Sequence, residues 1–241
     1  MRTGGEWAPA SEKDSLAMRF DRVAARYDRL NALNPGYTKH LRWSAERLAL
    51  PEDARVLDLC CGTGLSTSAL RRAYPRARIT ALDASAGMLN VARRKPELGG
   101  VTWLLGDAMD PASAGAEGPY DGILMAYGIR NVVDLDACLR RLRDLLASGG
   151  ALCLHEYSVA GSRRARTVWK LVTSLVIIPA GFVLTGSTAL FRYLRRSVLE
   201  FDDVSSLQDR LRRAGFVDVR TEAMDGWQRD IVHSFMAWQP E

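Results

Sequence analysis

Lysine is scarce in this chain of 241 residues. Of its 33 basic side chains only Lys13, Lys39, Lys95 and Lys170 are lysines, and the others are arginines. The net charge of +5 is modest for this length, and no basic run alternates with aromatic residues as in nucleic-acid-binding segments. We therefore expect no nucleic-acid partner.

Cysteine and histidine are also rare. The four cysteines, two of them adjacent at Cys60 and Cys61, fit neither a disulfide framework nor a zinc spacing. They predict small buried thiols in a reducing compartment and no metal site. His155 and His233 each lie alone on a predicted strand, where histidine is more often a core residue than a catalyst. We leave both out of the predicted site.

The chain shows no N-terminal apolar segment of the kind that directs secretion, and we predict a cytoplasmic protein. Its longest apolar stretch, 171–186, is interrupted by Pro179 and Gly181 and is shorter than the about 20 residues of a spanning helix. Basic side chains flank this stretch at 163–170 and 192–196. We expect it to close a pocket, and the basic flanks would also suit contact with anionic lipid at the inner membrane face.

Strand and helix patterns alternate regularly after Pro51. Short apolar strands that alternate with helices are typical of a parallel sheet covered on both faces, so we predict an α/β, Rossmann-like fold. We expect helices at 66–73, 85–94, 134–147 (ended by Gly149–Gly150) and 203–215, and strands at 55–59, 78–83, 101–105, 122–126, 151–157, 216–223 and 229–238.

Three segments lie outside this alternation. Residues 1–15 are polar and are expected to be disordered. Residues 16–50 have a helical pattern, with Phe20, Val23 and Tyr27 at three- and four-residue spacing. Within the main domain, 51–241, residues 158–201 are predicted to form an inserted helical cap.

The first predicted strand runs into the glycine turn 58-DLCCGTG-64. Glycines at such a turn let the backbone approach a ligand where the next helix begins. The dinucleotide-binding pattern would need a third glycine at position 67, which is Thr67. Asp58, four residues before Gly62, suits an ammonium group better than a pyrophosphate.

Two further acids end the next two predicted strands. Asp83 lies 21 residues beyond Gly62, where a carboxylate can accept hydrogen bonds from both ribose hydroxyls. Asp107 can reach an exocyclic amine of adenine. One acid alone would be weak evidence, because acids also cap turns, but three at successive strand ends favour S-adenosylmethionine (SAM), which has an amino-acid end, a ribose and no phosphate. The predicted cofactor site comprises Asp58, Gly62, Thr63, Gly64, Asp83, Ala84, Met88, Asp107, Ala108 and Ala126.

The chain resembles the class I SAM-dependent methyltransferases, and more narrowly the C-methyltransferases of ubiquinone and menaquinone biosynthesis. The narrower resemblance rests on 20-FDRVAARYDRLNAL-33, 127-YGIRNV-132, 156-EYS-158 and 191-FRYLRRSV-198, which occur in family order. It implies a seven-stranded, mostly parallel sheet with a helical cap. It also implies that the N-terminal helical segment closes over the cofactor through Tyr27.

Methylation of a ring carbon needs alignment, exclusion of water and an electron-rich ring, which a deprotonated quinol hydroxyl supplies. Arg130 and Asn131 offer a cation and an amide that would stabilise this phenolate. Arginine is not expected to act as the base, because its pKa exceeds about 12. Tyr127 is expected to form one wall of the pocket that holds the substrate ring. The alternative for Arg130 is structural, a pairing with Asp134 at the start of the next helix.

We therefore expect a SAM-dependent C-methyltransferase that acts on a lipophilic, demethylmenaquinol-like quinol. Two alternatives stay open, namely methylation of another apolar aromatic or polyketide, and a SAM-binding assembly subunit without activity. The sequence leaves the oligomeric state open, and a homodimer would be compatible with it.

Overall fold

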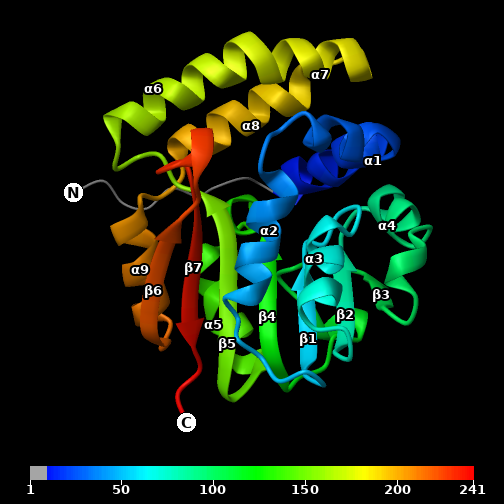
Figure 1. Cartoon of the computed structure of the whole chain (residues 1–241), viewed down its shortest axis with the longest axis vertical. Coiled ribbons are helices and arrows are strands. Elements are labelled where there is room, and N and C mark those ends of the chain that lie inside the picture. The colour runs from blue at the N-terminus through cyan, green and yellow to red at the C-terminus, as the bar shows by residue number, and fades with distance from the viewer. Residues whose placement is uncertain (1–9) are drawn as a thin grey trace.

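Seven strands form one sheet in the order β3-β2-β1-β4-β5-β7-β6 in the computed structural model, which describes residues 10–241 (Figure 1). Only β7 runs against its neighbours, pairing antiparallel with both β5 and β6. The predicted mostly parallel α/β sheet is confirmed. The strands are β1 Arg55–Leu59, β2 Arg78–Asp83, β3 Thr102–Leu105, β4 Tyr120–Ala126, β5 Leu146–Tyr157, β6 Val217–Ala223 and β7 Val232–Trp238.

Helices cover both faces of the sheet, because successive side chains of each strand point to opposite faces. On β1, Val56 belongs to the apolar cluster that includes residues of α2 and α3, whereas Leu57 belongs to the cluster that includes residues of α5 and α9. The covering helices are α2 Tyr37–Glu46, α3 Leu65–Ala73, α4 Ala86–Ala92, α5 Leu135–Leu145 and α9 Val204–Arg213, and single 3-10 turns occupy Pro96–Leu98, Ala112–Ala114 and Gly226–Gln228.

A further layer of helices lies across one end of the sheet (Figure 1). It consists of α1 (Ala10–Ala32) and the cap helices α6 (Arg163–Val172), α7 (Ile178–Thr185) and α8 (Ala189–Glu200). The predicted disorder of residues 1–15 is wrong for residues 10–15, which belong to α1, and residues 1–9 lie outside the described part. This layer covers the edge of the sheet at which the carboxyl ends of the parallel strands lie.

The outermost cap helix continues from α6 into α7 through a π-helical turn, Thr173–Ile177. Proline removes an N–H donor and crowds the preceding turn, and the wider π turn accommodates Pro179. Gly181 allows close packing, since a Cβ there would lie 2.2 Å from the ring of Phe191. The expected interruption of this stretch is therefore wrong. Among residues 10–241, Arg163–Thr185 is the one helix long and apolar enough to cross a membrane, by length and composition alone.

The glycine pair 149–150 does not end α5. The helix stops at Leu145, and β5 starts directly at Leu146. The β4–β5 register shifts between Tyr120 and Gly122, and Gly149 has φ +71° within the irregular segment opposite. Glycine suits this position because a bulge with positive φ disfavours a side chain.

Candidate active site

The glycine turn between β1 and α3 lines a cavity of about 470 Å³. Gly62 has φ +54°, and a Cβ added there would meet nothing within 4 Å, so a ligand can approach its backbone. Gly64 (φ +82°) serves packing instead, because its Cβ would lie 2.9 Å from Leu98. Cys60 also has a positive φ, +59°, where glycine would be easier. Of the two predicted glycines, only Gly62 borders the cavity.

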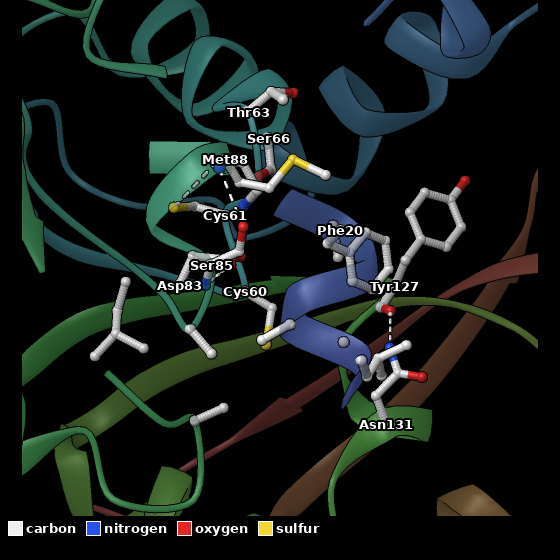
Figure 2. Close-up of a pocket in the computed structure, with 18 of the residues that line it drawn as sticks. Phe20, Cys60, Cys61, Thr63, Ser66, Asp83, Ser85, Met88, Tyr127 and Asn131 are labelled. Carbon is white, nitrogen blue, oxygen red and sulfur yellow. Dashed lines mark hydrogen bonds between the residues drawn. The ribbon is translucent and has the colours of Figure 1, made fainter. Parts of the chain in front are cut away.

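Asp83 connects the first two strand ends. Its Oδ2 accepts a hydrogen bond from the Gly62 N–H, and its Oδ1 accepts one from the Ser85 N–H, both at 2.8 Å. Burial raises the pKa of Asp83, against the lowering effect of these two hydrogen bonds. Figure 2 shows Asp83 beside Ser85 on the cavity wall. Its carboxylate is therefore held at the position predicted for ribose recognition.

Asp58 lies behind the turn and is fully buried. Its Oδ2 accepts hydrogen bonds from Ser66 Oγ at 2.8 Å and Thr67 Oγ1 at 2.6 Å. Its Oδ1 has no hydrogen-bond partner among the described residues. Burial raises the pKa of this carboxyl to about 7. Asp58 does not line the cavity, and an ammonium group bound at the turn would compensate its charge.

The remaining predicted residues come from several elements and the turns between them. Asp107 accepts a hydrogen bond from the Met109 N–H at 2.8 Å, which fixes the turn after β3. The cavity thus brings together nearly all predicted site residues, and only Asp58 and Gly64 stand behind its wall. Those lining it are Tyr27, Gly62, Thr63, Asp83, Ala84, Met88, Asp107, Ala108, Ala126, Tyr127, Arg130 and Asn131.

Two acids on α1 hold this helix over the cavity. Asp21 Oδ1 accepts hydrogen bonds from Ser85 Oγ and, at 2.8 Å, from the Gly87 N–H. Asp28 accepts one from Thr63 Oγ1 at 2.5 Å and pairs with Lys95 Nζ at 2.7 Å. The sequence prediction missed both. The signal was present, because two acids seven residues apart share one face of a helix.

Arg130 lies on the 3-10 turn Ile129–Asn131 after β4 and is 5% exposed. Its Nη1 donates to Glu156 Oε1 and to the Tyr127 carbonyl oxygen, each at 2.7 Å. Burial opposes the charge of Arg130, yet Glu156 raises its pKa overall. The structural alternative of a pairing with Asp134 is wrong, because Asp134 caps α5 by accepting from the Ala137 N–H. The charge partner of Arg130 comes from β5.

Asn131 and Tyr127 stand at the same strand end. Asn131 Nδ2 donates to the Tyr127 carbonyl oxygen at 3.2 Å (Figure 2), and its Oδ1 accepts from the Tyr193 hydroxyl of α8 at 2.9 Å. Tyr127 has φ +56°, a rare conformation that these contacts secure. Its ring stacks on Tyr37 at 5.5 Å and lies 4.8 Å from the ring of Tyr157. Asn131 therefore ties the strand end to the cap.

A second cavity of about 310 Å³ adjoins the first. Tyr27, Tyr127 and Arg130 line both cavities. The second extends beneath the cap and is walled mainly by apolar side chains. The cap residues that line it are Val172, Val176, Ile177, Ala180, Leu190, Phe191, Tyr193 and Leu194.

A model of the ubiE/COQ5 methyltransferase family matches residues 10–234. The chain belongs to this family. It is 34% identical over 210 residues to the demethylmenaquinone methyltransferase of Thermus thermophilus, covering 85% of this chain and 94% of that one. It is 33% identical over 206 residues to the 2-phytyl-1,4-naphtoquinone methyltransferase of Thermosynechococcus vestitus, covering 83% and 90%.

Solved structures agree on the fold. The [4+2]-cyclase SpnF superposes with a TM-score of 0.71 at 18% identity, covering 99% of both chains. A SAM-dependent methyltransferase of Thermotoga maritima, described as a possible histamine N-methyltransferase, gives a TM-score of 0.65 at 19% identity, covering 93% of this chain and 99% of that one. The class I methyltransferase fold is confirmed.

The chain is a SAM-dependent methyltransferase, and SAM is its methyl donor. The residues present fit this cofactor, since Gly62 leaves open space at the turn and Asp58 Oδ1, behind it, is a buried acceptor without a hydrogen-bond partner in the described part of the chain. Asp83 and Asp107 would hold the ribose and the adenine, and Tyr27 would cover the cofactor. SAM supplies an electrophilic methyl group when bound.

Proposed function

We propose that this methyltransferase methylates a ring carbon of a lipophilic quinol of the demethylmenaquinol type. The names of the relatives from Thermus thermophilus and Thermosynechococcus vestitus, which refer to naphthoquinone-type compounds, support this substrate class. The observation that carries the proposal is the pair of adjoining cavities. Their shared wall at Tyr127 and Arg130 would place a ring beside the methyl donor, with room for an apolar tail beneath the cap.

The chemistry divides between the quinol and the protein. Loss of a hydroxyl proton makes the ring carbon nucleophilic. That carbon would then form a bond to the methyl group that bound SAM supplies, and the electron pair of the broken carbon–sulfur bond would stay on sulfur. The ring carbon finally loses its own proton. Arg130 would donate to the quinolate oxygen, because a guanidinium can donate but cannot take a proton. Among residues 10–241, protein groups accept hydrogen bonds from Nη1 and Nε, which leaves Nη2 for this contact.

Purified protein, SAM and a set of reduced quinones test the proposal. We expect release of S-adenosylhomocysteine with demethylmenaquinol, and a higher KM when the prenyl tail is removed. Turnover of another apolar aromatic or polyketide in place of every quinol would favour the first alternative. SAM binding without turnover of any acceptor would favour an assembly subunit.

We further propose that this enzyme is cytoplasmic and that its cap brings it to an anionic membrane surface. Leu175 and Val183, on the outer cap helix, are 72% and 81% exposed. Val176 is 57% exposed and also lines the second cavity, which places the cavity mouth beside this apolar face. Arg163, Arg164, Arg166 and Lys170 precede the face, and basic side chains that flank an apolar helix suit anionic lipid headgroups.

Vesicle flotation tests this contact. We expect binding to vesicles that contain phosphatidylglycerol and weak binding to phosphatidylcholine alone. Leu175→Glu combined with Val183→Glu should abolish binding, whereas the control Val217→Glu, at an exposed site on β6, should not. Equal binding of all variants would contradict the proposal. Protein that cannot be extracted from the vesicles, as is typical of a protein with a membrane-spanning helix, would also contradict it.

A further inference from the structure

A series of hydrogen-bonded polar side chains runs from Arg47, at the end of α2, to Tyr127 at the shared cavity wall. Arg47 Nη1 lies 2.8 Å from Ser234 Oγ, and Ser234 Oγ lies 2.6 Å from Ser44 Oγ. Ser44 Oγ lies 2.7 Å from His155 Nδ1, and His155 Nε2 lies 2.9 Å from the Tyr127 hydroxyl. Ser44, Ser234 and His155 are fully buried. These contacts link five residues of four elements without a gap.

Arg47 determines which group donates and which accepts in each hydrogen bond of this series. A guanidinium can only donate, so Ser234 accepts from Arg47 and is left with one hydrogen to donate. Ser44 and the Cys153 thiol are its neighbours, and oxygen is the better acceptor. A nearby cation also favours O–H groups that point away from it, and successive hydrogen bonds in one direction strengthen each other. Ser234 therefore donates to Ser44, and Ser44 donates to His155 Nδ1.

His155 continues the same donor-to-acceptor direction through its two ring nitrogens. Burial, with smaller contributions from His40, Arg47 and His233, lowers the pKa of His155 to about 3, so the ring is neutral and carries one proton. Because Nδ1 accepts from Ser44, that proton is on Nε2, which donates to the Tyr127 hydroxyl oxygen. Tyr127 is then free to direct its own hydrogen elsewhere.

We propose that this series of hydrogen bonds fixes Tyr127 as a hydrogen-bond donor to the quinolate oxygen, beside Arg130. The inference rests on the proposed function for its substrate. Tyr157, whose ring lies 4.8 Å away, is a hydrogen-bond partner of the Tyr127 side chain, and a bound quinolate would compete for the same hydrogen. A fixed donor stabilises charge without reorientation during the reaction. Tyr127 takes no proton, and Ser44, Ser234, His155 and Arg47 act as positioning residues.

The tautomer of His155 can be measured without any substrate. Protein labelled with 15N-histidine contains three rings, and long-range 1H–15N correlations distinguish their tautomers. Loss of one signal set in His155→Gln assigns the ring. We expect neutral His155 with its proton on Nε2. A proton on Nδ1, or a doubly protonated ring at neutral pH, would overturn the inference whatever the substrate is.

A double-mutant cycle tests the role in turnover. Tyr127→Phe should lower kcat about 10²-fold, and Ser44→Ala about tenfold, with SAM affinity unchanged in both. Ser44→Ala should cost nothing further in the Tyr127→Phe background. The control is Ser158→Ala, which removes another buried hydroxyl and should affect only thermal stability. Equal losses from Ser44→Ala in both backgrounds would overturn the inference. Absence of quinol turnover by the wild type would overturn the proposed function and leave the tautomer result standing.

Discussion

Arg130 and Glu156 form a buried ion pair, with Nη1 2.7 Å from Oε1 and exposures of 5% and 0%. The same Nη1 also donates to the Tyr127 carbonyl oxygen. Glu156 pairs with the charge of Arg130, so the guanidinium is a fixed donor rather than a free cation. The pair also holds the end of β4, with its unusual Tyr127 backbone, against β5.

Arg130→Lys should separate a role in turnover from a role in stability. Lysine keeps the charge but loses the planar fork that reaches Glu156, Tyr127 and a substrate together. We expect unchanged SAM affinity and a kcat lower by about 10²–10³. Arg141→Lys, at an exposed site on α5, is the control. An Arg130→Lys variant with normal kcat and only a lower Tm would reduce Arg130 to a structural residue.

Gly62→Ala should weaken SAM binding through the position of its Cβ. Gly62 and Gly100 both have positive φ, and a Cβ at either would meet nothing within 4 Å of protein, but only Gly62 lines the cavity. Both substitutions should lower the free energy of unfolding by about 1–3 kcal/mol through backbone strain. Calorimetry should show a loss of SAM affinity for Gly62→Ala alone. Equal affinities in the two variants would place the cofactor elsewhere.

Asp58 should make stability depend on pH. Burial raises its pKa to about 7, above the about 3.9 of a free carboxyl, so the folded chain binds this proton more tightly than the unfolded chain. Its contribution is therefore largest below about pH 4 and declines as the pH rises through 7, by at most about 1.4 kcal/mol per pH unit. Without SAM, Tm should fall over this range more steeply in the wild type than in Asp58→Asn. Parallel Tm profiles would contradict the assigned pKa.

The same carboxyl should couple cofactor binding to pH. An ammonium group favours ionised Asp58, so SAM affinity should rise as the pH increases through about 7. Titration calorimetry at several pH values measures this directly. In Asp58→Asn the rise should disappear. A rise of the same size in both proteins would assign it to another group.

Local patterns were sufficient to predict the sheet and the edge at which the acids of the predicted cofactor site lie. Asp83 ends a short apolar strand and Asp107 lies two residues beyond the next one, and parallel strands bring their carboxyl ends to one edge. Glycine spacing identified the turn, although Gly64 proved to serve packing. The structure of such strands and turns depends on residues that are close in sequence, and for them the prediction and the structure agree.

Partners that depend on the tertiary structure could not be predicted. Glu156, 26 residues beyond Arg130, becomes its partner only when β5 pairs with β4. His155 looked like an ordinary core histidine, because Ser44 lies 111 residues away on α2. The π turn that carries the cap helix past Pro179 has no recognisable sequence signal here. In each case packing between distant elements decided the outcome.

Transfer of a trideuteromethyl group from labelled SAM to demethylmenaquinol tests the central claim most directly. The site of the label can be read by tandem mass spectrometry and NMR of the product. We predict one label per quinol, bonded to a ring carbon, with both hydroxyls free. A labelled methyl ether would show O-methylation, and recovery of unlabelled quinol from protein that binds SAM would contradict the proposed activity itself.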